Sequence, residues 1–94
     1  MSRKIEFLTQ RGNNMKIYDY EGKKNICGIR VHEARRKLNL TQSELAAKLQ
    51  IEGIIIERDS ISRIEIGTRF VTDYEIKILA KILNVDVKWL LDIE

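Results

Sequence analysis

Charged and apolar side chains stand close together in the segment RDSISRIEIG, which begins at Arg58. On a helix, Arg58, Asp59 and Arg63 would face solvent. Ile61 and Ile64 would then face the core. An arginine can donate two parallel hydrogen bonds to guanine O6 and N7, and a carboxylate can accept from cytosine N4. The segment therefore has two interpretations, an ordinary solvated helix face or a surface that reads DNA.

The remaining reactive side chains do not form a set typical of catalysis. No nucleophile has a base and an orienting group beside it, and no glycine-rich phosphate loop is present. The carboxylates show no paired, apolar setting for acid–base chemistry. His32 has no cysteine or acidic cluster at metal-ligand spacing, so we expect a surface residue, and Cys27 is interpreted as a small buried hydrophobe. We therefore expect a protein that is not an enzyme and needs no metal or cofactor.

Size and composition predict a small globular domain. The chain has 94 residues, of which 44% are hydrophobic and 33% charged, values that are ordinary for a folded protein. A single cysteine fits a reducing compartment. The start lacks the apolar stretch of a secretory signal, and no apolar run approaches the ~20 residues that cross a bilayer. These features together predict a cytoplasmic location and no membrane partner.

Charge divides the chain into two parts. Residues 1–25 hold six lysines and arginines against three acidic residues, which accounts for the whole net charge of +3, and residues 26–94 are neutral. Net charge alone therefore does not identify a nucleic-acid partner. We expect residues 1–25 to be an N-terminal arm, mobile or extended, in which MKIYDY at 15–20 would be at most a short strand. A helical domain is expected at 26–94.

Apolar residues recur at helical spacing after the arm. The inward residues expected for the first helix are Cys27, Val31, Ala34 and Leu38. The tetrapeptide TQSE at 41–44 is a capping box that opens the second helix. Later inward sets are Leu45, Ala46 and Leu49; Ile61 and Ile64; Ile76, Leu79, Ala80 and Leu83; and Trp89, Leu90 and Leu91. The pattern predicts an all-α, compact five-helix bundle.

Residues that stop or start helices mark the boundaries. Gly53 and Gly67 are expected to end the second and third helices, Asn84 the fourth, and Asp86 to cap the last. The run Ile54–Ile56 is β-branched and favours extended backbone. Consecutive residues cannot all face inward, so at least one of these isoleucines should be exposed or in an interface.

Two short helices joined by a turn, the second small and basic, suit the major groove of B-DNA. The sequence resembles the Cro/repressor-type (xenobiotic-response-element) helix-turn-helix domain of bacteria and phages. The matching stretches are GIRVHEAR at 28–35, LTQSELAAKL at 40–49, ISRIEIGTR at 61–69 and LAKILNVDVKWLL at 79–91. The link QIEGIIIERDS is longer than the family's usual turn and resembles a longer-turn subgroup. The implied fold is phage-repressor-like.

The resemblance also implies which residues contact DNA. These are Gln42, Arg58, Asp59, Ser62, Arg63, Gly67 and Arg69. Gln42 would contact phosphate at the start of the second helix, and the third helix would read bases. Main-chain amides near Gly67 and the side chain of Arg69 would meet the backbone. Asp59 would accept from cytosine N4 or orient an arginine. Ile66 stands where family members often have asparagine, which removes one phosphate contact.

Arg35 and Glu65 match a partly buried ion pair of the family that joins the first helix to the end of the third. We assign both residues to the scaffold. Removing one partner of such a pair strands a buried charge and costs about 3–5 kcal/mol. The basic arm would add phosphate or minor-groove contacts.

The resemblance implies a sequence-specific, double-stranded DNA-binding transcriptional regulator, a repressor that forms a homodimer through the Trp89 region. An alternative stays open: a helix-turn-helix used as a protein-interaction module, antitoxin-like or regulator-binding. The neutral charge of residues 26–94 and the isoleucines at 54–56 favour that alternative. A regulatory protein partner is compatible with both hypotheses.

Overall fold

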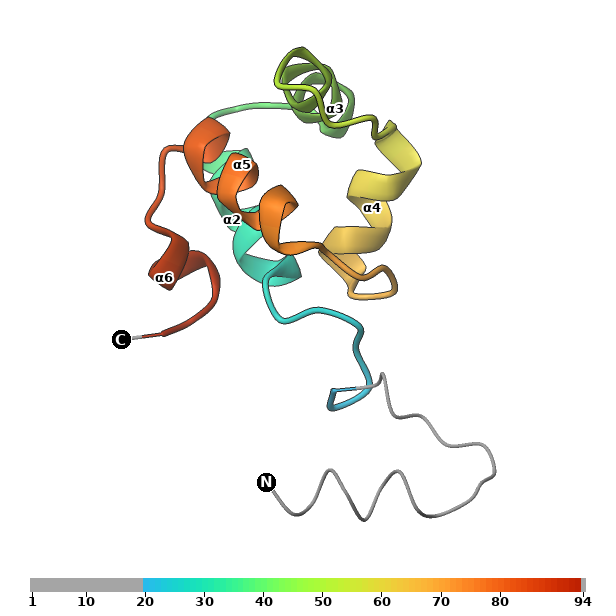
Figure 1. The fold of residues 1–94 in the computed structure, drawn as a ribbon, viewed down its shortest axis with the longest axis vertical. Helices are drawn as coiled ribbons and strands as arrows, with labels where there is room; N and C mark the ends of the chain where they lie inside the picture. Colours follow the sequence, from blue (N-terminus) through green and yellow to red (C-terminus); the bar gives the residue numbers. More distant parts are fainter. Residues whose placement is uncertain (1–19, 94) are drawn as a thin grey trace.

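The computed structural model describes residues 20–93, and this part of the chain is helical. Its helices are α2 (Gly28–Lys37), α3 (Gln42–Ile51), α4 (Arg58–Ile66), α5 (Asp73–Leu83) and α6 (Val87–Leu90), shown in Figure 1. The β pairing recorded in these residues is one isolated bridge between Tyr20 and Lys23. The predicted all-α class with five helices is confirmed. Expectations for residues 1–19, including most of the arm and of the candidate strand, lie outside the described residues.

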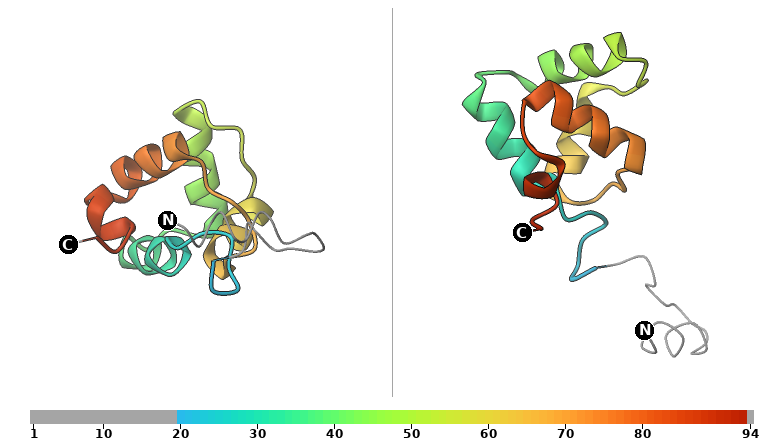
Figure 2. Two further views of the ribbon diagram at one scale, coloured as in Figure 1. Left: turned by 60° about the horizontal axis from the view of Figure 1, so that its bottom comes forward. Right: turned by 60° about the vertical axis from the view of Figure 1, so that its left-hand side comes forward.

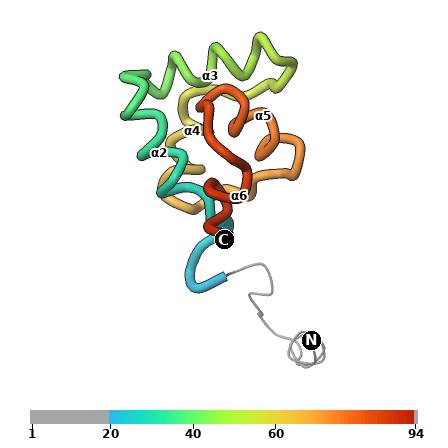
Figure 3. The backbone as a smooth tube through the Cα atoms, turned by 90° about the vertical axis from the view of Figure 1, so that its left-hand side faces the viewer, coloured from blue at the N-terminus to red at the C-terminus, as the bar shows by residue number. Residues whose placement is uncertain are grey.

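The helices surround one apolar core. α4 packs against α2 and α3, while α5 packs against α2, α3 and α6. Figure 3 and the right-hand view of Figure 2 show α3 crossing one end of the described part of the molecule, with α6 and the chain leading into α2 toward the opposite end. The largest fully buried side chains are Leu45, Leu49, Ile61, Ile64, Leu79, Leu83, Leu90, Val31 and Cys27. No helix within residues 20–93 is both long and apolar enough to span a membrane.

The ends of the helices follow the sequence signals. The Thr41 hydroxyl accepts from the Glu44 amide at 3.0 Å, and the Thr41 amide donates to the Glu44 carboxylate at 2.8 Å, which completes the predicted capping box. Gly67 and Asn84 adopt left-handed conformations at the ends of α4 and α5, and the Asp86 side chain caps α6. These local predictions are confirmed.

The inward position predicted for Leu38 is wrong. This side chain is 44% exposed, although it falls on the same helical face as the buried Val31 and Ala34. α2 ends at Lys37, so Leu38 is its C-cap residue, and Asn39 directly after it takes a left-handed conformation with φ 59°, which leads the chain out of the helix. The apolar spacing that predicted α2 therefore extended one residue beyond the end of the helix.

The turn between α3 and α4 separates the three consecutive isoleucines. Ile56 is 3% exposed and joins the core, Ile54 is half-buried, and Ile55 is 93% exposed. Gly53 has φ +91° just after α3 ends, and the side-chain nitrogen Nε2 of Gln50 donates to the Ile56 carbonyl at 2.7 Å. The longer turn is thus an ordered extension, and the expectation of an exposed isoleucine is confirmed.

The start of α2 is fastened to the end of α4. The Asn25 side-chain oxygen accepts from the Gly28 amide at 2.8 Å, while its nitrogen donates to the carbonyls of Ile64 at 3.0 Å and Arg69 at 2.8 Å. A Cβ atom on Gly28 would overlap the carbonyl oxygen of Ile64. Glycine is therefore needed here for close backbone approach, and this approach helps to set the position of α4.

Gly28→Ala should destabilise the fold because backbone, which cannot move aside cheaply, fills the space that the methyl group needs. Overpacking of this kind costs about 1–3 kcal/mol. Urea unfolding followed by circular dichroism would measure the loss in free energy of unfolding. Ser43→Ala, at an exposed position of α3, is the control and should change stability little. Equal stability of Gly28→Ala and wild type would contradict the proposed close approach.

Candidate nucleic-acid interface

The outward side of α4 carries Asp59, Arg63 and Ile66, which recur at i, i+4 and i+7. Opposite them, Ile61 and Ile64 are both 0% exposed and hold the helix to the core. Within residues 20–93 no hydrogen bond or ion pair engages the guanidinium of Arg63, and the residue is exposed. Ile66 is 57% exposed one turn beyond it. α4 thus combines a buried apolar face, which fixes the helix, with an exposed arginine on the outward side that could bind a ligand.

Arg58 lies at the first position of α4 and is oriented from two sides. Its Nη2 donates to the Asp59 carboxylate at 3.2 Å and its Nη1 to the Gln42 side-chain oxygen at 3.4 Å. Both side chains of the ion pair are more than half exposed. An exposed pair contributes only about 0–1 kcal/mol, so it can be exchanged for a ligand at small cost. Asp59 thus contacts Arg58, and by spacing Ser62 follows on the same side of the helix, half-buried.

The Glu65 carboxylate connects three helices. It accepts from Arg35 of α2 at 2.7 and 3.0 Å, from the Gln42 amide of α3 at 3.0 Å, and lies 3.0 Å from His32 Nδ1. The predicted ion pair between Arg35 and Glu65 is confirmed, and both side chains are largely buried, 8% and 6% exposed. His32 is at the surface as expected, but its contact with Glu65 was not predicted.

Hydrogen bonds keep Glu65 ionised despite its burial. Burial alone raises the pKa of the carboxyl group, but the bonds that it accepts from Arg35, His32 and Gln42 outweigh this effect and lower the pKa from the usual 4.5. The charge on Glu65 is therefore part of the folded structure at neutral pH.

The turn after α4 uses its main-chain amides internally. The Gly67 amide donates to the carbonyls of Arg63 at 3.0 Å and Ile64 at 3.1 Å, and the Thr68 amide donates to Arg63 at 2.9 Å. The Gly67 carbonyl accepts from the Lys24 amide at 2.8 Å. The resemblance implied that amides near Gly67 approach a phosphate. In the structure those of Gly67 and Thr68 bond to the end of α4.

Arg69 is held at the start of α5. Its two terminal nitrogens donate to the Glu75 carboxylate at 3.0 and 3.1 Å, and one of them also donates to the Phe70 carbonyl at 2.9 Å. Glu75 is 6% exposed and completes a second capping box with Thr72. Burial raises the pKa of Glu75, but the bonds from Arg69 and Thr72 prevail and lower it. The T-x-x-E spacing at residues 72–75 could have indicated the capping box, but not the pairing of Glu75 with Arg69.

Glu65→Gln should destabilise the protein by about 3–5 kcal/mol at neutral pH, because the buried Arg35 would lose its charge partner. The lowered pKa of Glu65 means that its contribution is present above pH 4.5 and disappears as the pH falls through the lower folded value. Wild-type stability should thus fall on acidification, and the variant should fall less. Urea titrations at a series of pH values test this, and equal pH dependence of the two proteins would refute it.

Comparison with known proteins gives one match. A helix-turn-helix family model matches residues 31–90, which is more than half of the chain and extends from α2 to α6. Comparisons with curated proteins and with solved structures find no match. The matched residues contain the ion pair of Arg35 with Glu65, the capped α3 and the outward face of α4. The chain belongs to the XRE-type helix-turn-helix family of DNA-binding regulators.

Proposed function

We propose that the protein is a sequence-specific, double-stranded DNA-binding transcriptional repressor that acts in the cytoplasm and places α4 in the major groove. The observation that carries this proposal is the outward side of α4. Arg63 is exposed and unpaired within residues 20–93, while Ile61 and Ile64 on the other side are fully buried. Family membership supports DNA as the ligand.

Arg63 is proposed as the main base-reading residue, because its planar guanidinium can bind guanine O6 and N7 together. Arg58 would give up its exposed hydrogen bond to Asp59 and contact the DNA in its place, and Asp59 would then accept a hydrogen bond from cytosine N4. Gln42 is half-buried at the first turn of α3. A glutamine amide has two N–H donors; one binds Glu65 and the second is available to a phosphate at the positive end of the helix.

The other proposed contacts are weaker. Ser62 is half-buried and would reach a phosphate or base only at close approach of α4. Arg69 would have to share its guanidinium between Glu75 and a phosphate. The main-chain amide of Gly67 would have to leave its bonds to α4. We therefore expect most of the sequence discrimination to come from Arg58, Asp59 and Arg63.

Selection from a pool of random duplex DNA should enrich a defined site, and Arg63→Lys should then relax the preference at one base pair. Lysine keeps the charge but lacks the bidentate geometry, so discrimination should fall by about 1–3 kcal/mol, or roughly 5- to 150-fold, with little change in salt dependence. Fluorescence anisotropy with the selected duplex and its single-base variants measures both quantities.

Lys77→Ala is the control for this experiment, because Lys77 is an exposed cation on α5, away from α4 and α6 in the sequence, and α5 packs against α2, α3 and α6. The control should keep the full preference. Failure of the wild-type protein to enrich any sequence would overturn the proposed DNA-reading function.

We also propose that the protein binds a two-fold site as a homodimer through α6 and the residues after it. Val87 and Ile93 are 39% and 54% exposed, and Trp89 and Leu91 beside them are half-buried. Together they offer an apolar surface of the kind that self-association covers. Two copies of α4 would then contact half-sites about one helical turn, ~34 Å, apart.

Sedimentation equilibrium should show a dimer that Val87→Glu weakens, because a charge would be buried in the interface. Ile55→Glu, at the 93% exposed turn before α4, is the matched variant and should leave the dimer intact. A wild-type monomer that also fails to dimerise on the selected DNA would contradict the proposal, as would loss of the dimer by Ile55→Glu alone.

A second candidate function, a protein-interaction module, is favoured by one observation. Ile51 at the end of α3 and Ile55 in the following turn are 83% and 93% exposed. If they bind a protein partner, Ile55→Glu should abolish that complex while Arg63→Lys leaves it unchanged. Isothermal titration with a partner recovered by crosslinking at residue 55 would distinguish this function from DNA binding.

A further inference from the structure

A tight turn at residues 20–24 is docked on the end of α4. The Tyr20 amide donates to the Lys23 carbonyl at 2.7 Å, and the Lys23 amide donates back to Tyr20 at 2.9 Å. The Lys24 amide then donates to the Gly67 carbonyl at 2.8 Å. Asn25, the next residue, bonds to the carbonyls of Ile64 and Arg69. The turn is therefore fixed relative to the proposed reading helix by main-chain and side-chain bonds.

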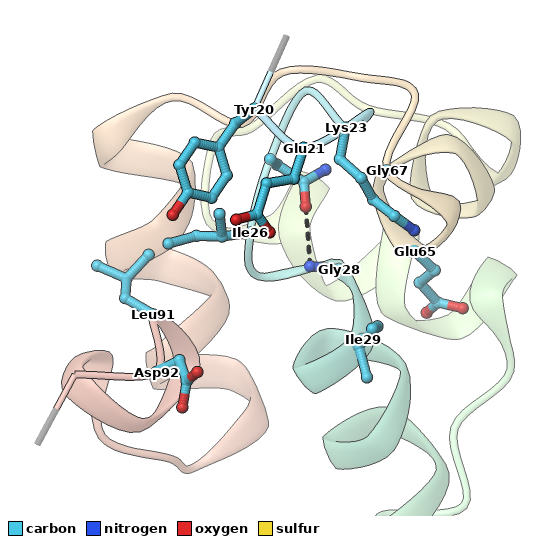
Figure 4. A pocket seen from close by; sticks show the side chains of 11 residues that line it. Tyr20, Glu21, Lys23, Ile26, Gly28, Ile29, Glu65, Gly67, Leu91 and Asp92 are labelled. Carbon is cyan, nitrogen blue, oxygen red and sulfur yellow. Dashed lines mark hydrogen bonds between the residues drawn. The ribbon is translucent and has the colours of Figure 1, made fainter. Parts of the chain in front are cut away.

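The two lysines of this turn flank the end of α4. Figure 4 shows the Lys23 side chain running along Gly67, and a Cβ on Gly67 would lie 2.5 Å from Lys23 Cδ. The Lys23 amine reaches the Ile66 carbonyl at 3.5 Å, a long contact that leaves donors for a ligand. The Lys24 amine lies 5.3 Å from the centre of the Phe70 ring. Both lysines are exposed.

Nearby acidic groups do not neutralise these amines. Glu65 is bound by Arg35 and Glu75 by Arg69, so both buried carboxylates already have cationic partners. Glu21 shares the turn and is exposed, but within residues 20–93 no ion pair joins it to either lysine. Lys23 and Lys24 therefore place two exposed cations at the end of α4, and both belong to residues 1–25, which carry the whole net charge.

The main-chain amides of Gly67 and Thr68 are already engaged within the fold at this place. The amides of Gly67 and Thr68 are bonded to α4, and the Lys23 side chain covers Gly67. A phosphate at the end of α4 would therefore meet lysine amines first. The turn also precedes residues 31–90, so it lies outside the part of the chain that the family model describes.

We propose that Lys23 and Lys24 form a second DNA-backbone site, which binds phosphates flanking the base pairs that α4 contacts. The site rests on the proposed DNA-binding function and adds affinity without sequence discrimination, because phosphate contacts are the same for every sequence. A purely structural role makes a different prediction: Lys23 would only offset the negative end of α4, and its loss would change stability rather than DNA binding.

The test compares the salt dependence of binding to the selected duplex for wild type, Lys23→Gln, Lys24→Gln and the double variant. Glutamine keeps the Cβ, Cγ and Cδ atoms that cover Gly67 and removes the charge. Each lost phosphate contact should reduce the slope of log K against log salt by about 0.9, and the double variant by about 1.8. The preferred sequence should not change. Lys23→Arg should restore the slope.

Lys77→Gln, on α5 and outside both the turn and the proposed dimer surface, is the matched control and should keep the wild-type slope. Unchanged slopes in the Lys23 and Lys24 variants, measured where wild type selects a site, would overturn the second site and leave the proposed function intact. A changed base preference without a changed slope would overturn it as well. If wild type selects no DNA, the proposed function fails and this site fails with it. Thermal unfolding identifies any variant whose weaker binding reflects a damaged fold.

Discussion

The carboxylate of Glu65 is the polar contact on which the placement of the elements proposed to face DNA depends. It belongs to α4, accepts two bonds from Arg35 of α2 and one from Gln42 of α3, and is almost fully buried. Apolar packing of Ile61 and Ile64 alone would tolerate small rotations of α4 about its axis. The directional bonds to Glu65 restrict that rotation, and so they determine which side of α4 faces outward.

Charge in this protein divides into pairs that hold the fold and cations that remain outside. Arg35 and Arg69 are bound to the buried carboxylates of Glu65 and Glu75, whereas Arg63 is in solvent. Buried pairs cancel in the net charge but leave the exposed cations where they are. A neutral sum for residues 26–94 is therefore compatible with a positive surface, and the sum by itself was a poor argument for the protein-interaction alternative.

The sequence predicted best what depends on short spacing. Capping at Thr41, the helix ends at Gly67 and Asn84, and the inward positions of Ile61 and Ile64 all involve residues within one or two turns of each other. Leu38 was predicted wrongly because the left-handed Asn39, and not the apolar period, ends α2. In the candidate site, spacing and the family resemblance together placed the outward arginines of α4 and the pair of Arg35 with Glu65.

The spacing of residue types in the sequence did not predict contacts that depend on how the helices pack. Asn25 bonds to Ile64 and Arg69, which lie 39 and 44 positions later in the sequence, and no local signal indicates those partners. The sequence pattern also did not indicate that the Lys23 side chain would cover Gly67, or that Glu75 would be the partner of Arg69. Each of these depends on how α2, α4 and α5 approach, which only the packed structure defines.

Two of the surfaces that carry exposed apolar residues, α6 and the α3–α4 turn, have different consequences for DNA binding. α6 packs against α2 and α5, so a second copy joined there would leave the outward side of α4 open. Ile55 is only three residues before Arg58, so a protein bound to it would lie beside the proposed reading residues. Self-association through α6 therefore agrees with DNA binding, whereas a partner at the α3–α4 turn would compete with it. One molecule could thus have both candidate functions only if it binds DNA and the protein partner at different times.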